Sequence, residues 1–167
     1  ETRMSLRRRL GMTGEASACE VCTAVSSTLF GAGGLDDQQS AGLFSGNVEN
    51  YYDPRNNMID QVLERRSGIP ISLSLVYMAT AEAVGACLPE SGTSGGWDGR
   101  LVGINAPGHL LLAPADNCRD FCIDPFVGSL LDDTLALQEF VHARMPRGAV
   151  AEDEMPRFVA ALLERPM

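Results

Sequence analysis

The sequence contains no lysine, because all 13 of its Lys and Arg residues are arginine. Lysine is normally among the commonest residues, and its absence excludes any mechanism that needs a lysine Schiff base or a lysine general base. The chain also lacks a run of about 18 apolar residues, so no segment is predicted to span a membrane as a helix. The only two histidines are His109 and His142. Imidazole chemistry therefore has few candidates.

Positive charge is scarce beyond the N-terminus. The formal net charge is −9, with 22 Asp and Glu against 13 Arg. A chain of this charge repels phosphate backbones, which argues against general nucleic-acid binding. Four arginines fall within residues 1–14, which are expected to form a basic, solvated tail. The chain begins at Glu1 rather than Met, so we expect a fragment or a processed form, and its original targeting cannot be read from it.

Length and composition fit one domain. With 167 residues, 45% of them hydrophobic, the chain can bury a core of its own. We therefore expect a single domain over residues 15–167. The five cysteines are an odd number, which argues against a disulfide-stapled secreted scaffold. An intracellular protein is expected, in the cytoplasm or in an organelle after removal of a targeting segment.

The spacing of the cysteines raises one metal hypothesis. Cys19-x-x-Cys22 and Cys118-x-x-x-Cys122 together supply four thiolates, which is a zinc-type ligand set. The first pair, however, lies in "EASACEVCTAVSSTLF", whose apolar periodicity predicts an amphipathic helix over residues 15–30. Cysteine in such a helix behaves as a small hydrophobe. We therefore favour plain buried thiols over a zinc site or a redox pair, and expect no metal and no cofactor.

The apolar patterns predict helices first, then an antiparallel sheet, then helices again. After the helix at 15–30, helices are predicted over about 57–66 and 69–84. The second of these is apolar on nearly every side, so it is predicted to be the buried central helix. This order is typical of an α+β fold. The remaining elements are predicted strands over 101–105, 109–115 and 121–128, and predicted helices over 134–145 and 155–167.

A Gly-rich loop, "CLPESGTSGGWDGR", follows the central helix and contains the single tryptophan, Trp97. Trp97 is interpreted either as an anchor for a partner or as a lid over a small hydrophobic patch. The loop has no phosphate-binding lysine and does not lead from a strand into a helix, so nucleotide binding is not supported. Arg65 and Tyr52 are the other candidate binding residues. His142, on the first C-terminal helix, is expected at the surface.

Three blocks occur in order along the chain: "YYDPRNNMIDQVLERRSGIPISLSLVYMATAEAVG", "PGHLLL" and "IDPFVG". Together they resemble the SirB-type branch of the transglutaminase-like superfamily, most strongly over residues 45–131. That branch occurs in bacterial proteins, often beside tetratricopeptide repeats, and as the middle part of a class of F-box proteins. The resemblance implies a papain-like core, in which a central helix packs on an antiparallel sheet.

The resemblance also implies a Cys–His–Asp site at the start of the central helix and on the next two strands. His109 falls at the histidine position and Asp124 at the aspartate position. In such a site the Asp fixes the tautomer of the His, whose other ring nitrogen takes the nucleophile's proton. This sequence departs from the pattern at the nucleophile. Gly68-Ile69-Pro70 stands where Gly-x-Cys would be expected, and no cysteine is near.

Two side chains are candidates to replace the missing thiol. Ser72 is the nearest hydroxyl, close to the positive end of the helix dipole, where a developing alkoxide would be stabilised. A serine in a packed helix can instead bond back to a carbonyl one turn earlier, and we favour this structural role. Cys122 lies two residues before Asp124, and so on the same strand face. It is a more remote candidate, because it belongs to the wrong element.

Three functional hypotheses follow. The favoured one is a non-catalytic transglutaminase-like module for protein binding or regulation within a larger chain or complex. The second is a hydrolase or acyltransferase that uses Ser72 with His109 and Asp124, and the third is a structural subunit of a large assembly. The missing cysteine favours the first. All three predict a helix over 69–84, packed against strands whose His109 and Asp124 are hydrogen-bonded.

Overall fold

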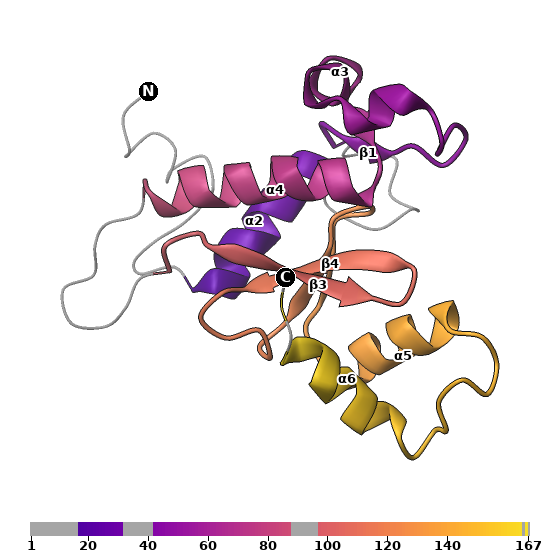
Figure 1. Cartoon of the computed structure of the whole chain (residues 1–167). Coiled ribbons are helices and arrows are strands. Elements are labelled where there is room, and N and C mark those ends of the chain that lie inside the picture. Colours follow the sequence, from indigo (N-terminus) through magenta and orange to yellow (C-terminus); the bar gives the residue numbers. More distant parts are fainter. Residues whose placement is uncertain (1–16, 32–41, 88–96, 165, 167) are drawn as a thin grey trace.

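The computed structural model describes residues 17–31, 42–87, 97–164 and 166 (Figure 1). The order of elements confirms an α+β fold. None of the helices within these ranges is long and apolar enough to cross a membrane. In chain order the elements are α2 (Ala18–Phe30), β1 (Ser45–Gly46), the 3-10 helix η1 (Pro54–Asn57), α3 (Ile59–Arg65), β2 (Ser67–Gly68), α4 (Pro70–Gly85), β3 (Leu101–Ala106), β4 (His109–Pro114), β5 (Cys122–Asp124), β6 (Ser129–Leu131), α5 (Thr134–Arg144) and α6 (Met155–Leu163).

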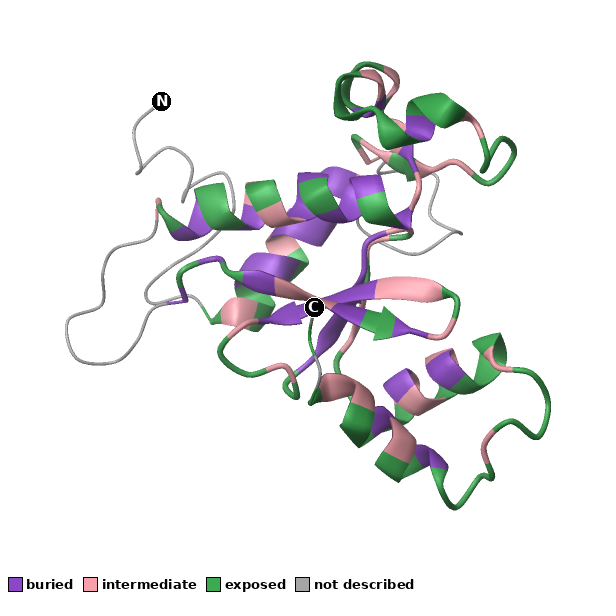
Figure 2. Cartoon of the chain, viewed as in Figure 1, coloured by how far each residue is buried: buried purple, intermediate pink, exposed green. Residues whose placement is uncertain are grey.

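An antiparallel sheet with the strand order β3-β4-β5-β6 separates two helical layers. Helices α2 and α4 pack on one face, and α5 and α6 pack on the other (Figure 1). Successive strand residues point to opposite faces: Leu112 and Ile123 join the α2–α4 core, whereas Leu111 and Cys122 join the α5–α6 core. Figure 2 shows buried residues on the strands between the layers. Because both faces are covered, these strands are apolar almost continuously.

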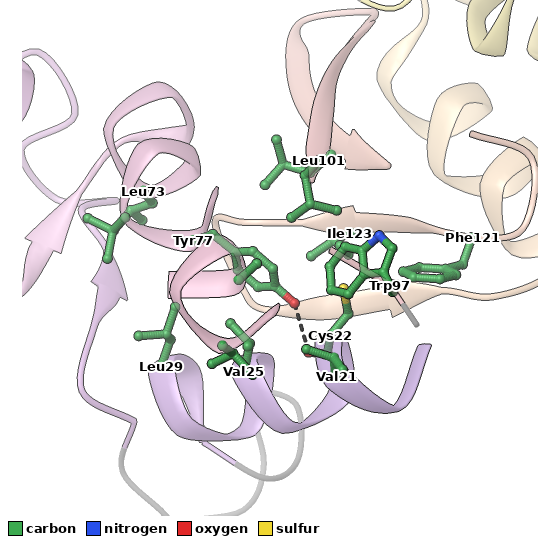
Figure 3. Packing of buried hydrophobic residues seen from close by; sticks show 14 of the residues in the cluster. Val21, Cys22, Val25, Leu29, Leu73, Tyr77, Trp97, Leu101, Phe121 and Ile123 are labelled. Atoms are coloured by element: carbon green, nitrogen blue, oxygen red, sulfur yellow. Dashed lines mark hydrogen bonds between the residues drawn. The ribbon is translucent and has the colours of Figure 1, made fainter. Parts of the chain in front are cut away.

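Helix α4 (Pro70–Gly85) is the central helix, as predicted over 69–84. Pro70 occupies the first helical turn, where a missing N–H costs no hydrogen bond. Leu73 and Tyr77 on its inner face are fully buried. The Tyr77 hydroxyl donates to the carbonyl oxygen of Cys22 at 2.7 Å and lies 2.9 Å from Ser26 Oγ. These bonds join α4 to α2 inside the core, and Figure 3 shows the one to Cys22.

Helix α2 (Ala18–Phe30) begins at a capping box. Ser17 Oγ accepts a hydrogen bond from the Glu20 N–H, and the Glu20 carboxylate accepts one from the Ser17 N–H, which satisfies two N–H groups of the first turn. The prediction of a helix over 15–30 is therefore confirmed in type. Residues 15 and 16 lie outside the described residues.

The cysteines do not form the four-thiolate site. Cys22 lies in the α2–α4 core and Cys122 in the α5–α6 core, on opposite faces of the sheet, so the two pairs cannot share one ion. No group of three or more His, Cys, Asp or Glu that could hold a metal is found among the described residues. Burial raises the pKa of both thiols to about 12, so both behave as small apolar side chains.

The helix predicted over about 57–66 is confirmed as α3 (Ile59–Arg65), but it is shorter than predicted. Residues 54–57 form η1, whose N-cap Asp53 accepts the Arg55 N–H at 2.9 Å. Helix α3 starts only at Ile59 and has no side-chain cap. It ends because Arg66 adopts a left-handed conformation with φ 54°. Asn56 and Asn57 therefore belong to η1 and do not cap α3.

Gly68 has a different role. It lies in β2, which pairs in parallel with β1 as a two-residue strand. A Cβ atom at this position would lie 2.7 Å from Ser72 Oγ, so glycine is needed for the close approach of this strand to the start of α4. Strands this short leave no periodicity for sequence analysis to detect.

The strand predicted over 121–128 is shorter than expected, and a strand that was not predicted follows it. β5 ends at Asp124, a turn follows, and β6 begins at Ser129. Gly128 closes the turn with φ 76°, and its N–H donates to the Asp124 carbonyl oxygen at 2.8 Å. The sheet therefore has a fourth strand, and the turn places Phe126 beside the histidine.

Candidate functional site

The predicted pair is formed. His109 begins β4, and Asp124 ends the neighbouring strand β5. His109 Nε2 lies 2.8 Å from Asp124 Oδ1, which is a hydrogen-bonding distance. The side chains are 10% and 3% exposed. The pair is thus largely shielded from water.

Asp124 organises the groups around it. Its Oδ1 also accepts the Phe126 N–H at 2.9 Å, and the Arg144 guanidinium from α5 lies 3.8 Å from its Oδ2. A carboxylate only accepts hydrogen bonds, so His109 Nε2 is the donor in this pair. His109 Nδ1 makes no hydrogen bond to the described residues. It is not one of their fully buried polar atoms that lack a hydrogen-bond partner.

Aromatic side chains hold the His109 ring. The Phe126 ring lies 6.3 Å from it and the Phe140 ring 5.4 Å, both edge-to-face, a geometry that aromatic pairs favour. The Arg144 guanidinium packs over the Phe140 ring, with its Cζ atom 3.4 Å from the ring centroid. Tyr51 continues the row, 6.5 Å from Phe126. The orientation of the imidazole is therefore fixed from several sides.

Ser72, the candidate nucleophile, is turned to its own backbone. Its Oγ accepts the Ile69 N–H at 3.1 Å and donates to the Ile69 carbonyl oxygen at 3.1 Å. The residue is only 3% exposed. Ser74 likewise donates to the Pro70 carbonyl oxygen at 2.7 Å. Both hydroxyls thus make the local backbone bonds that the structural interpretation favours, and neither is bonded to His109.

Cys122 is no better placed for chemistry. It is fully buried in the α5–α6 core, and burial raises the pKa of its thiol to about 12. The thiolate is the reactive form of cysteine, so at neutral pH this residue is inert. The structure therefore brings together His109 and Asp124 but places neither Ser72 nor Cys122 in contact with them through a hydrogen bond.

The three candidate binding residues have different environments. Trp97 is 6% exposed and packs in the core with Cys22 and Phe121 (Figure 3), so it is a core side chain, and a binding role for it stays a prediction. Its Nε1 has no hydrogen-bond partner within the described ranges. Arg65 is partly buried and bonded inside the protein. Tyr52, by contrast, is 93% exposed.

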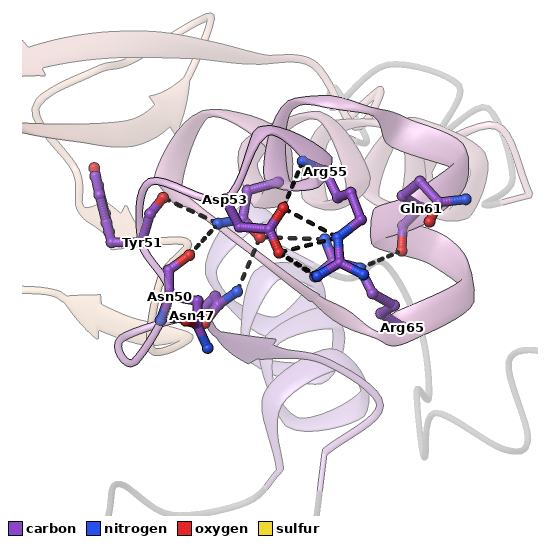
Figure 4. A network of polar contacts seen from close by, with 8 residues as sticks. Asn47, Asn50, Tyr51, Asp53, Arg55, Gln61 and Arg65 are labelled. Carbon is purple, nitrogen blue, oxygen red and sulfur yellow. Dashed lines mark hydrogen bonds and ion pairs between the residues drawn. The ribbon is translucent and has the colours of Figure 1, made fainter.

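The buried Asn56 holds the loop that carries Tyr52, and sequence analysis missed this role. Asn56 is 0% exposed, and its Nδ2 donates to the carbonyl oxygens of Asn50 and Tyr51 at 2.8 and 3.0 Å. Its Oδ1 accepts from Asn47 Nδ2 at 3.0 Å and from the Arg65 guanidinium at 3.2 Å (Figure 4). Both donor hydrogens and both acceptor sites of the amide are used, so the loop is firmly fixed.

An ion pair closes the same network. Arg55 and Arg65 both approach the Asp53 carboxylate, at 2.6 and 3.7 Å (Figure 4). Hydrogen bonds from Arg55 hold the pKa of Asp53 down at about 2. The carboxylate is therefore ionised throughout the physiological range. The sequence feature that indicates this arrangement is the "DPRNN" segment, which supplies Asp53, Arg55 and Asn56 within five residues.

A central helix packed on an antiparallel sheet, with a His–Asp pair on adjacent strands, defines a papain-like, transglutaminase-like core. The chain matches the family model of the transglutaminase-like superfamily over residues 2–162, and it belongs to this superfamily.

The chain is also similar to curated proteins, and these matches confirm the SirB-type resemblance. It is 36% identical over 111 residues to a UPF0162 protein of Xylella fastidiosa strain Temecula1, covering 66% of this chain and 34% of that protein. A UPF0162 protein of Vibrio cholerae is 47% identical over 89 residues, with 53% and 28% covered. F-box only protein 21 of Mus musculus is 35% identical over 83 residues, with 50% and 11% covered. The match thus spans at most 34% of the length of these relatives, and no solved structure matches.

Proposed function

We propose that this chain is a non-catalytic transglutaminase-like module that binds a protein partner within a larger chain or assembly. One observation carries the proposal: the His109–Asp124 pair is complete, but it has no nucleophile to serve. Pro70 stands at the expected cysteine position, and the Ser72 hydroxyl is bonded to Ile69. Covalent catalysis needs a hydroxyl or thiol held by the base, and a proline ring offers nothing to deprotonate.

The pair has a structural role in this account. Asp124 connects β4 through His109, the β5–β6 turn through the Phe126 N–H and α5 through Arg144. A buried carboxylate with several partners fixes the relative positions of these elements. The hydrolase alternative would require Ser72 to give up both bonds to Ile69 and turn toward His109. No contact in the site favours that rearrangement.

The loop that carries Tyr52 is the proposed binding surface. Tyrosine contributes a large, rigid and amphipathic contact area with little loss of side-chain entropy. The buried amide of Asn56 already holds the neighbouring backbone in place, which lowers the cost of ordering the loop on binding. The similarity to a protein named as an F-box protein supports a role in a protein assembly.

Replacing Tyr52 with alanine is expected to reduce partner binding roughly tenfold, which is typical of an interface hot spot. The variant should unfold at the same temperature as the wild type, because Tyr52 is 93% exposed. The measurement is quantitative affinity capture from cells of the source organism, with wild-type and variant baits compared protein by protein.

The matched control is Leu135→Ala, which removes another exposed apolar side chain, 63% exposed, on α5 rather than in this loop. It should keep the proteins that Tyr52→Ala loses. Equal recovery of every bound protein by the wild type and the Tyr52 variant would refute this binding surface.

A further inference from the structure

Helix α4 has one apolar face that nothing in the described chain covers. Ile71 and Leu75, one turn apart, are 59% and 57% exposed. Ala79, Ala83 and Ala86 continue the same stripe and are also exposed. Figure 2 shows exposed residues recurring along the length of this helix. A helix that is apolar on all sides is normally buried on all sides, so this face is suited to another polypeptide.

The size of the stripe favours a single helix as its occupant. Helix α4 has 16 residues, and a helix of that length is roughly 24 Å long. One face of it offers far less than the ~800 Å² per partner of a standard stable interface. A second copy of this chain would therefore need more surface than the stripe provides. It would also bring together two chains that each carry a net charge of −9.

The shape and charge of this face of α4 further limit which kind of helix can bind it. The bulky Ile71 and Leu75 stand at the N-terminal half, whereas the alanines at the C-terminal half allow close backbone approach. Glu82 is exposed and is the only charged residue of α4. It lies toward the C-terminal end, where the helix dipole is also negative. A complementary helix would place large apolar side chains over the alanines and a basic side chain near Glu82.

We propose that the exposed face of α4 binds an amphipathic helix of a partner protein, with an apolar stripe flanked by basic residues. In this mode of recognition the apolar side chains of the partner helix, spaced three and four residues apart, pack on the apolar surface. The inference extends the proposed binding function to a second surface, and its test does not involve Tyr52.

The test uses a fluorescent leucine–lysine amphipathic helix about four turns long as the probe, with binding measured by fluorescence anisotropy. The double variant Ile71→Asp/Leu75→Asp is expected to bind it at least about tenfold more weakly. The added negative charges alone would strengthen binding of a basic probe. A loss of affinity in this variant therefore shows that the probe contacts the apolar side chains. Glu82→Gln should weaken binding to a smaller degree.

The control is Leu135→Asp, which introduces one such negative charge at another exposed helical leucine, 63% exposed on α5. It should bind the probe at least as tightly as the wild type. Ile71→Ala/Leu75→Ala repeats the test without new charge, and thermal unfolding followed by circular dichroism shows that each variant is folded.

Three results would overturn the proposal. The first is unchanged or tighter binding by the Ile71→Asp/Leu75→Asp variant, which would reduce the interaction to net charge. The second is equal binding of a leucine–glutamate helix of the same pattern. The third is a dimer in sedimentation analysis that dissociates on Leu75→Asp, because a second copy would then cover this face.

Discussion

Replacing Asp124 with alanine is expected to lower the free energy of unfolding by roughly 2–4 kcal/mol. The carboxylate is 2% exposed and accepts hydrogen bonds from His109 Nε2 and from the Phe126 N–H. Both donors lie in a part-buried environment and would lose their acceptor together. The Arg144 guanidinium would lose the charge 3.8 Å away. Urea denaturation, with the slope checked for two-state behaviour, measures the change.

Asp124→Asn is the matched control, because it keeps the shape and one acceptor oxygen but removes the charge. Its loss should be smaller than that of alanine, about 1–2 kcal/mol. His109→Ala should likewise cost less than Asp124→Ala, since it leaves the Phe126 bond intact. If the alanine variant is as stable as the wild type, the carboxylate does not organise the site, and the structural role assigned to the pair is wrong.

The protein is expected to lose stability steeply between pH 9 and pH 12. Burial raises the pKa of Cys22 and Cys122 from 9.0 to about 12 in the folded state. Below pH 9 both states keep these protons and the stabilisation is complete. Above pH 9 the unfolded chain releases them while the folded protein retains them, so stability falls as pH rises, by up to about 1.4 kcal/mol per pH unit for each thiol.

The lack of lysine makes this window simple to interpret, because lysine would ordinarily titrate near pH ~10.4. Burial also raises the pKa of Tyr77, which contributes in the same direction. Urea denaturation at a series of pH values measures the slope. Cys22→Ala and Cys122→Ala should each flatten it. A slope that both variants leave unchanged would show that these thiols do not control alkaline stability.

The central fold was predictable because its signals are local and continuous. Pro70 at the first turn and the lack of any turn residue before Gly85 predict α4, and the apolar runs around Leu111 and Ile123 predict the strands. The His109–Asp124 contact came from the family resemblance rather than from spacing, since two residues fifteen positions apart have no local reason to meet. The absence of the nucleophile could be predicted from the sequence, because Pro70 stands at the expected cysteine position.

The features that sequence analysis missed depend on contacts between distant segments. Nothing in the sequence around Asn56 indicates burial, and only the approach of Asn47 and Arg65 makes it the centre of a buried network. Trp97 in a Gly-rich loop reads as exposed, but the core formed with Phe121 covers it. The apolar pattern of α4 predicts burial on most faces but does not show which face stays open: Ile71 is 59% exposed, because no described segment packs on that side.

The central claim is that this chain keeps a His–Asp pair without a nucleophile. The most direct test is to react the folded protein with a serine-directed fluorophosphonate probe, beside the His109→Ala and Ser72→Ala variants, and to locate any label by mass spectrometry. Both hydrogen bonds of the Ser72 hydroxyl are made to Ile69, so we expect no labelling by the probe in any of the three proteins. Labelling of Ser72 in the wild type that disappears in the His109→Ala variant would contradict the account and show a working hydrolase-type site.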